Sequence, residues 1–261
     1  MDNFTALVGT ANVLQSVAFI AEHERSTHVK YFVIGDDEPH VSDKIKFIGR
    51  DQIADAVRDM DMVFMLTDLN DVATCETAHL ISDCVKNENI FFSVVIVQSA
   101  SNEFSGEMSR LQQNFGLLVN LEEQPNNQSV EEFSYKIVHG IHSVYDEEFY
   151  SYLMPIDGTY FLELLTVGRK SFVSFGEASG ENAVIAAINT AIDSPLIKKS
   201  LQEAQSVFLN VLGCDSLSML EVNEASTTVQ EAVSHGAEFY WVVNLDETIG
   251  EKIFVMIFVR V

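Results

Sequence analysis

Apolar strands and helical segments alternate through the first half of the chain, and this alternation is the strongest constraint on the fold. Short apolar runs typical of buried strands lie at residues 4–8, 29–34, 45–48, 62–66, 91–97 and 117–119. Helical spacing of apolar residues appears between several of them, at 12–21, 51–58 and 74–87. Such a rhythm is typical of a mainly parallel sheet with helices on both faces. We therefore predict an α/β domain of the Rossmann-like type over residues 1–128.

A long helical pattern and a differently organised second part follow this domain. Apolar residues recur three and four apart over residues 129–153, and Pro155 and Gly158 end the pattern, which predicts one long central helix. Further strand patterns lie at residues 171–177, 205–212, 238–244 and 252–260, and helical patterns at 180–193 and 216–233. The last two strands are expected to form a hairpin. Residues 172–261 are therefore predicted to form an α+β domain with helices on one face of a four-stranded sheet.

The composition describes an acidic protein and excludes several classes of partner. The chain carries 39 Asp and Glu against 15 Lys and Arg, a net charge of −24. Such a surface repels nucleic acid and anionic lipid, which need a basic partner. The three cysteines are odd in number and show no CxxC motif, which indicates reduced thiols. With no long apolar span and no basic secretory start, we expect a cytoplasmic protein.

The turn after the strand at 62–66 has an unusual composition for its position. A turn from a parallel strand into a helix often holds a phosphate and is then lined with glycine. Here it reads D-L-N-D-V-A-T-C-E-T, without glycine and with the acids Asp68, Asp71 and Glu76. Two like charges about 4 Å apart repel by about 4 kcal/mol at an effective dielectric of about 20, so a phosphate is disfavoured. We expect Asp71 or Thr74 to cap the helix, with a magnesium site on the three acids as the alternative.

The second half resembles the C-terminal domain of FtsZ, the bacterial tubulin homologue. The resemblance rests on blocks at residues 176–196, 204–213, 216–225, 243–246 and 253–257. Their order, spacing and side-chain types agree over about a third of the chain, and G-E-N-A at 180–183 and S-P-L at 194–196 are the most distinctive. The resemblance implies a tubulin/FtsZ-like fold for the whole chain.

The first half resembles the same family more loosely. The stretch F-T-A-L-V-G-T-A-N at residues 4–12 occupies the place of the family's first strand and glycine-rich loop. The family signature G-G-G-T-G-T-G corresponds to D-V-A-T-C-E-T at residues 71–77, where only the threonine at 74 matches. The resemblance thus identifies five residues as remnants of a nucleotide site, and these are Gly9, Thr10, Asn12, Asp71 and Thr74.

The loop that supplies catalytic carboxylates in FtsZ is also altered. In the family it reads N-x-D-x-x-D, follows the central helix and acts on the nucleotide of the neighbouring subunit. The corresponding residues 155–160 read P-I-D-G-T-Y, so Asp157 survives as a catalytic remnant, with Glu163 as an alternative second carboxylate. One carboxylate without a phosphate loop is a poor catalytic set. The resemblance therefore implies loss of GTP hydrolysis and of tight GTP binding, and we do not expect an enzyme.

The function expected from the sequence is structural or regulatory. The resemblance implies a cytoskeletal, cell-division-related protein that associates with itself or with an FtsZ-family protein. The chain ends at Val261, where relatives continue into a tail that binds membrane-anchoring proteins, so no direct membrane anchor is expected. One alternative is a divergent filament-forming GTPase that holds GTP or GDP with magnesium. Another is a module that binds a small ligand in the cleft at the carboxyl ends of the strands.

Two further groups of side chains invite a metal or catalytic interpretation. Cys75, Glu76, His79 and Asp83 lie at spacings that suit zinc on one helix flank. His139 and His142 lie three residues apart on the long helix, with Asp146 one turn further on. No second ligand cluster accompanies the first group, and histidines on an apolar helix face are mostly packed. We therefore expect no metal and no cofactor.

Overall fold

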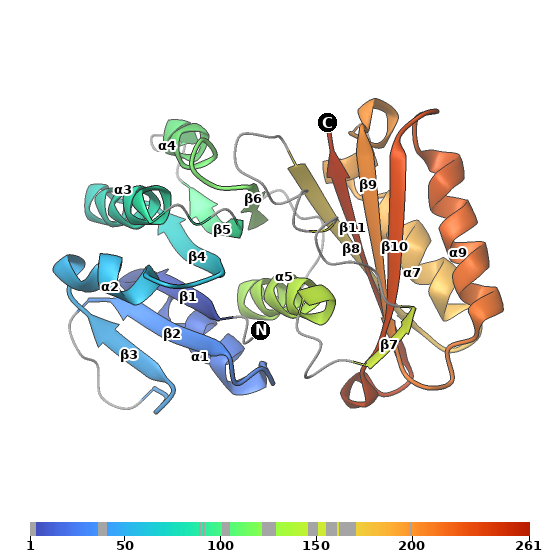
Figure 1. Ribbon diagram of the computed structural model, residues 1–261, viewed down its shortest axis with the longest axis horizontal. Helices are drawn as coiled ribbons and strands as arrows, with labels where there is room; N and C mark the ends of the chain where they lie inside the picture. The colour runs from blue at the N-terminus through green and yellow to red at the C-terminus, as the bar shows by residue number, and fades with distance from the viewer. Residues whose placement is uncertain are drawn as a thin grey trace. The chain divides into compact units, whose positions relative to one another are not determined.

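The computed structural model of this protein describes residues 4–35, 41–88, 90, 92–100, 105–121, 129–145, 151–154, 161, 171–198 and 200–261. These residues form two compact units, and the division falls inside helix α5 (Val130–Tyr145), between His139 and Gly140. Each unit contains one sheet with helices packed on it (Figure 1). None of the described helices is both long and apolar enough to cross a membrane.

The first unit contains a six-stranded parallel sheet. The strands follow the order β3-β2-β1-β4-β5-β6, and every neighbouring pair is parallel. Their bounds are Thr5–Thr10 for β1, Val29–Ile34 for β2, Ile45–Ile48 for β3, Met62–Leu69 for β4, Phe92–Ala100 for β5 and Leu117–Asn120 for β6. The strand order reverses between β1 and β4, so the carboxyl ends of these two strands meet at one edge. The predicted parallel α/β arrangement is confirmed.

Helices cover both faces of this sheet (Figure 1). They are η1 (Ala11–Val13), α1 (Leu14–His23), η2 (Arg50–Gln52), α2 (Ile53–Val57), α3 (Val72–Asn87) and α4 (Ser105–Leu111). On one face, Phe32 and Met65 of the sheet share a core with Ile81 of α3. On the other face, a side chain built at Gly9 of β1 would run into Val17 of α1. Successive residues of a strand point to opposite faces, which is why both helical layers find apolar partners.

The second unit contains a mixed five-stranded sheet with the order β7-β10-β9-β11-β8. The strands are β7 (Ser151–Met154), β8 (Ser171–Ser179), β9 (Ser206–Gly213), β10 (Glu238–Leu245) and β11 (Lys252–Arg260). The helices are α7 (Ala183–Ile192), α8 (Pro195–Lys198), η4 (Ser200–Glu203), α9 (Met219–Ala232) and η5 (Glu247–Ile249). Helices α7 and α9 lie on one face, where their apolar residues share a core with the sheet (Figure 1). The four expected strands are present, and β7 adds a short fifth strand at the edge.

The predicted end of the long helix is wrong. The described part of helix α5 runs to Tyr145, and Ser151–Met154 form β7, which pairs antiparallel with β10, so the helix does not extend to residue 153. The stretch S-Y-L-M continues the apolar spacing of the helix, so its local pattern fits either state. Pairing with the edge of β10 decides between them, because backbone groups at a sheet edge bond a neighbouring strand.

The predicted hairpin of the last two strands is also wrong. Strands β10 and β11 do not pair with each other, because β9 lies between them, parallel to β10 and antiparallel to β11. All eight residues of β9 are buried, as befits a central strand with both faces covered. The hairpin prediction used only the closeness of β10 and β11 in sequence, whereas the burial of β9 places it in the middle.

Backbone geometry explains the most distinctive block of the second unit. Gly180 has φ +87° and Asn182 has φ 59°, so both adopt the left-handed conformation in the turn between β8 and α7. Glycine and asparagine are the residues that adopt it at least cost. A Cβ at Gly176 would lie 1.8 Å from the carbonyl oxygen of Ala187, because β8 and α7 approach closely there. Gly176, Gly180 and Asn182 are therefore explained by the backbone geometry of this turn and by close packing.

Candidate functional site

The structure brings the five predicted remnants together at the carboxyl edge of the first sheet. Strands β1 and β4 pair with Gly9 opposite Leu66, so η1 after β1 and α3 after β4 begin side by side. The amide Nδ2 of Asn12 donates to the carbonyl oxygen of Asp68 at 3.2 Å and to Oγ1 of Thr74 at 3.3 Å. Residues 56 to 62 positions apart in the sequence thus share one small polar cluster.

Asp71, one of the two residues predicted to cap helix α3, is its cap. Its Oδ1 accepts the backbone N–H of Thr74 at 2.8 Å, and its Oδ2 accepts the Thr74 hydroxyl at 3.0 Å. The backbone bond is the largest cause that lowers the pKa of Asp71 below its usual value, and the Thr74 hydroxyl is the next. A helix N-terminus binds phosphate through such N–H groups. Here a carboxylate of the chain itself occupies that position.

The polar groups of the first loop also bond within the chain. The Thr10 hydroxyl donates to Oδ1 of Asn12 at 2.6 Å, and its oxygen lies 3.4 Å from Oγ1 of Thr67. Both ends of the Asn12 amide therefore have protein partners. Thr10 precedes η1 but makes no side-chain bond to a backbone N–H of that helix. The start of η1 is consequently less obstructed than the start of α3.

Packing accounts for the glycine that remains in this loop. A Cβ at Gly9 would lie 2.6 Å from Cγ2 of Val17 and 3.2 Å from Cγ2 of Val13. Real Cβ atoms do not approach so closely, and a valine side chain is too short to swing away. Gly9 therefore lets the start of α1 pack against β1, whether or not a ligand is bound.

Neither metal cluster considered from the sequence is assembled among the residues that the structure describes. Oε2 of Glu76 lies 3.6 Å from the guanidinium of Arg50, and the Asp71 carboxylate accepts the capping bond from Thr74. His79 bonds Glu107, and that bond is the largest cause that lowers the pKa of the Glu107 carboxyl. Burial raises the pKa of the Cys75 thiol, which favours its neutral form.

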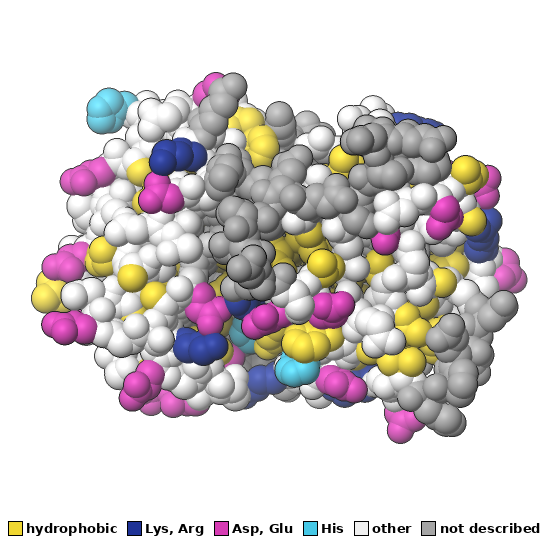
Figure 2. All heavy atoms as spheres, turned by 180° about the vertical axis from the view of Figure 1, so that it is seen from behind, with side chains coloured by type: hydrophobic (Ala, Val, Ile, Leu, Met, Phe, Trp, Pro, Cys, Tyr) yellow, Lys and Arg dark blue, Asp and Glu magenta, His cyan; other side chains and the backbone are white. Residues whose placement is uncertain are grey.

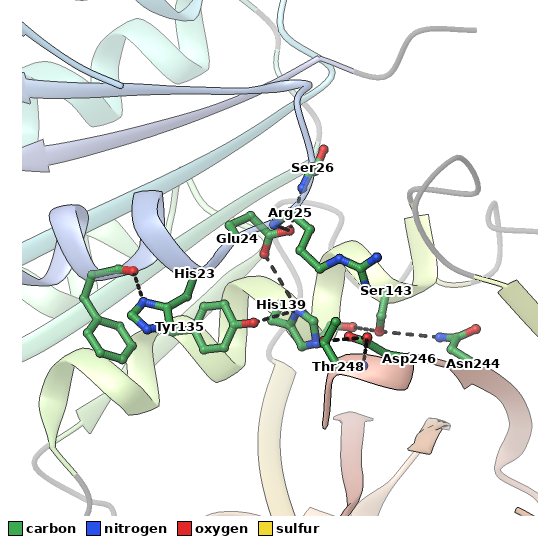
Figure 3. Close-up of polar contacts among 12 residues, drawn as sticks. His23, Glu24, Arg25, Ser26, Tyr135, His139, Ser143, Asn244, Asp246 and Thr248 are labelled. Carbon is green, nitrogen blue, oxygen red and sulfur yellow. Dashed lines mark hydrogen bonds and ion pairs between the residues drawn. The ribbon is translucent and has the colours of Figure 1, made fainter. Parts of the chain in front are cut away.

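The two histidines of α5 are buried, as expected for packed side chains, with 4% and 2% exposure for His139 and His142. Nδ1 of His139 lies 3.8 Å from Oε2 of Glu24 and 3.2 Å from the hydroxyl of Tyr135 (Figure 3). The Glu24 side chain is fully buried, and its Oε1 accepts the backbone N–H groups of Arg25 and Ser26. Sequence reasoning missed Glu24, because a glutamate after a helix gives no sign of burial.

Some predicted residues lie outside the described part of the chain. These are the catalytic remnant Asp157, its alternative partner Glu163, and Asp146 beside the histidines. The nucleotide-site remnants can therefore be assessed from contacts, whereas the role of Asp157 stays a prediction.

Comparison with known proteins agrees with this architecture. Residues 170–260 match the model of the FtsZ family, C-terminal domain. An empty FtsZ dimer from M. jannaschii superposes with a TM-score of 0.81 at 17% identity, over 99% of this chain and 88% of that chain. A point mutant of the M. jannaschii protein gives 0.81 at 18% identity, over 99% and 91%. CetZ from Methanosaeta thermophila gives 0.67 at 13% identity, over 98% and 86%.

These matches define the fold of the protein. The chain has the fold of the FtsZ and tubulin-like proteins, which confirms the fold class predicted from the sequence. Residues 170–260 are similar to the FtsZ C-terminal domain, and the chain as a whole has an FtsZ/tubulin-like fold. For the first half, the low identity to the solved structures shows the fold alone.

Proposed function

We propose that this protein is a structural or regulatory member of the FtsZ-like cytoskeletal proteins that has lost GTP hydrolysis and tight GTP binding. The observation that carries the proposal is the bond between the Asp71 carboxylate and the N–H of Thr74 at the start of α3. A phosphate at this helix start would have to displace a bonded carboxylate and would then lie beside its negative charge. Both effects weaken binding.

The surrounding contacts support the same proposal. The Asn12 amide bonds Asp68 and Thr74, so a nucleotide would have to break these bonds before using it. The Arg50 guanidinium, a cation near this turn, donates to the carbonyl oxygen of Ala73 and pairs with Glu76. This cation and the Asn12 amide, which could offset the charge of a phosphate, are therefore both bonded within the described part of the chain.

Titration with fluorescently labelled GTP and GDP, read by anisotropy, tests this proposal. We expect no saturable binding in the micromolar range and no phosphate release above the buffer rate. Asp71→Asn removes the charge but keeps a good capping residue, so any residual GDP affinity should rise severalfold. Glu76→Gln is the matched control, because it removes a charge already paired with Arg50 and should change affinity less. Micromolar binding by the unaltered protein would overturn the proposal.

We further propose that the protein associates with itself or with an FtsZ-family protein. The FtsZ of M. jannaschii with the same fold was solved as a dimer, which supports self-association here. Acidic side chains are scattered over the face shown in Figure 2, with fewer Lys and Arg among them. With a net charge of −24, copies repel each other at low salt, so sedimentation should show larger species as salt rises. A monomer at every salt concentration would exclude self-association.

The second candidate is a divergent GTP-binding filament former. The observation that favours it is the start of η1, where Thr10 leaves the backbone N–H groups without a side-chain cap. A nucleotide held there would depend little on α3. In the same titration, this candidate predicts binding that Asp71→Asn leaves unchanged and that promotes sedimentation of the protein.

A further inference from the structure

A cavity of about 730 Å³ lies on the first unit, away from the nucleotide-site remnants. Its described lining residues come from three segments of the chain. They lie within residues 25–32, which include the first part of β2, within residues 44–48, which include β3, and within residues 52–56, which include most of α2. The remnants described above lie at the carboxyl ends of β1 and β4. The cavity is therefore a separate feature, and its volume lies within the usual range of about 300–1,000 Å³ for small-molecule sites.

The cavity follows from strand alternation and from a short helix. Lys30 and Phe32 of β2 share one face of the sheet with Lys46 of β3, which pairs with Phe32 in register. On this face Phe32 and Ile48 belong to the core that α2 helps to cover. Helix α2 has only five residues, or about 7.5 Å at 1.5 Å per residue. Helix α2 therefore covers only a small part of this face of the sheet. Lys30 and Lys46 lie on the same face and are exposed.

The described residues that line the cavity carry a net charge opposite in sign to that of the whole chain. Its described lining holds four of the 15 Lys and Arg residues, namely Arg25, Lys30, Lys44 and Lys46. The one acidic residue of that lining, Asp55, pairs with Arg58 outside the cavity at 2.7 Å. The three lysines of this lining, Lys30, Lys44 and Lys46, repel each other, and a bound anion relieves this repulsion.

Two of these cations are positioned by the chain. Nζ of Lys44 donates to the carbonyl oxygen of Ala21 at 2.6 Å. Nζ of Lys30 lies 5.1 Å from the centre of the Phe4 ring, within the range of a cation–π contact. Lys46 has no ion pair with a residue that the structure describes. Each ammonium has three N–H donors, so one contact leaves Lys30 and Lys44 able to bind an anion.

We propose that this cavity binds a small organic phosphate with at least two negative charges and an apolar body. The phosphates would contact Lys30, Lys44 and Lys46, and the body would lie against Phe32 and Ile48. Cationic donors with an adjacent apolar surface are the arrangement that such ligands require. This inference is independent of the proposed loss of GTP binding, because the two sites share no residue.

Isothermal titration calorimetry of the full chain with adenosine diphosphate and with inorganic pyrophosphate tests the proposal. We expect one saturable site that binds adenosine diphosphate more tightly than pyrophosphate, because the nucleoside adds apolar contact. Affinity should fall as salt rises, since the lysines are exposed. Lys46→Glu should weaken binding about tenfold or more, since it replaces a charge-assisted bond with repulsion.

Two controls make the result specific. Lys86→Glu makes the same charge change at an exposed position of α3 in the same unit and should leave affinity within about twofold. Lys46→Gln removes the cation without adding a charge and should weaken binding less than Lys46→Glu. Thermal melting of each variant verifies that it is folded.

Three outcomes would overturn the proposal. The first is no saturable heat with either probe. The second is an equal loss of affinity in Lys86→Glu and Lys46→Glu, which would reflect net charge alone. The third is binding that changes in Asp71→Asn but not in Lys46→Glu, which would place the probe at the nucleotide-site remnants and count against the proposed function as well.

Discussion

Two strand-to-helix turns of this protein differ in their use of glycine. The turn after β8 carries Gly180 in the left-handed conformation, and β8 itself approaches α7 closely at Gly176. The turn after β4 has no glycine, and Asp71 caps α3 instead. The first turn lies in the part that matches the FtsZ C-terminal domain, and the second is where the sequence analysis predicts an altered family signature. The first turn keeps the residues that its backbone geometry needs, whereas in the second a carboxylate of the chain bonds the start of the helix, which supports the proposed loss of nucleotide binding.

The largest expected effect concerns Gly176, in the strand that leads into the first of these turns. Gly176→Ala should destabilise the second unit by about 3 kcal/mol or more, because the new Cβ would lie 1.8 Å from the carbonyl oxygen of Ala187. Urea unfolding measures the change. The control is Gly106→Ala in α4, where a Cβ meets nothing within 4 Å, and where alanine should stabilise the helix slightly. Equal stability of the two variants would mean that packing does not require Gly176.

A smaller effect is expected at Gly9, the glycine that remains near the altered turn. Gly9→Ala should cost about 1–3 kcal/mol, because its Cβ would lie 2.6 Å from Cγ2 of Val17. Pairing it with Val17→Ala sharpens the test. If the clash is the cause, the double variant should be more stable than the sum of the two single changes predicts. If the two changes in unfolding free energy simply add, packing against Val17 does not explain Gly9, and a role in ligand binding becomes the better interpretation.

The smallest effect concerns the cap of α3. Asp71→Ala should destabilise the first unit by about 1 kcal/mol, whereas Asp71→Asn, which can still cap, should lose less. The pKa of Asp71 is lowered in the folded chain, so its charged form stabilises the fold above the unfolded pKa. This contribution disappears as the pH falls through the folded pKa. Urea unfolding should therefore be measured from neutral to acidic pH. We expect the difference in unfolding free energy between the unaltered protein and Asp71→Asn to become smaller as the pH falls.

Local patterns in the sequence were sufficient for the fold class and for most elements. Continuous apolar runs mark β4 and β9 because both are buried on both faces. Residue type narrowed the cap of α3 to Asp71 or Thr74, and the structure shows that it is Asp71. The start of α9 was predicted two residues too early, at Ser216. The structure shows a capping box between Ser218 and Glu221, a pattern that is visible in the sequence.

Long-range contacts decided the remaining features. Periodicity describes which face of an element is apolar, but it does not say which strands become neighbours. The insertion of β9 between β10 and β11, and the pairing of β7 with β10, therefore appeared only in the tertiary structure. The cation-lined cavity has the same origin, because Lys30 and Lys46 become neighbours only when β2 and β3 pair in register.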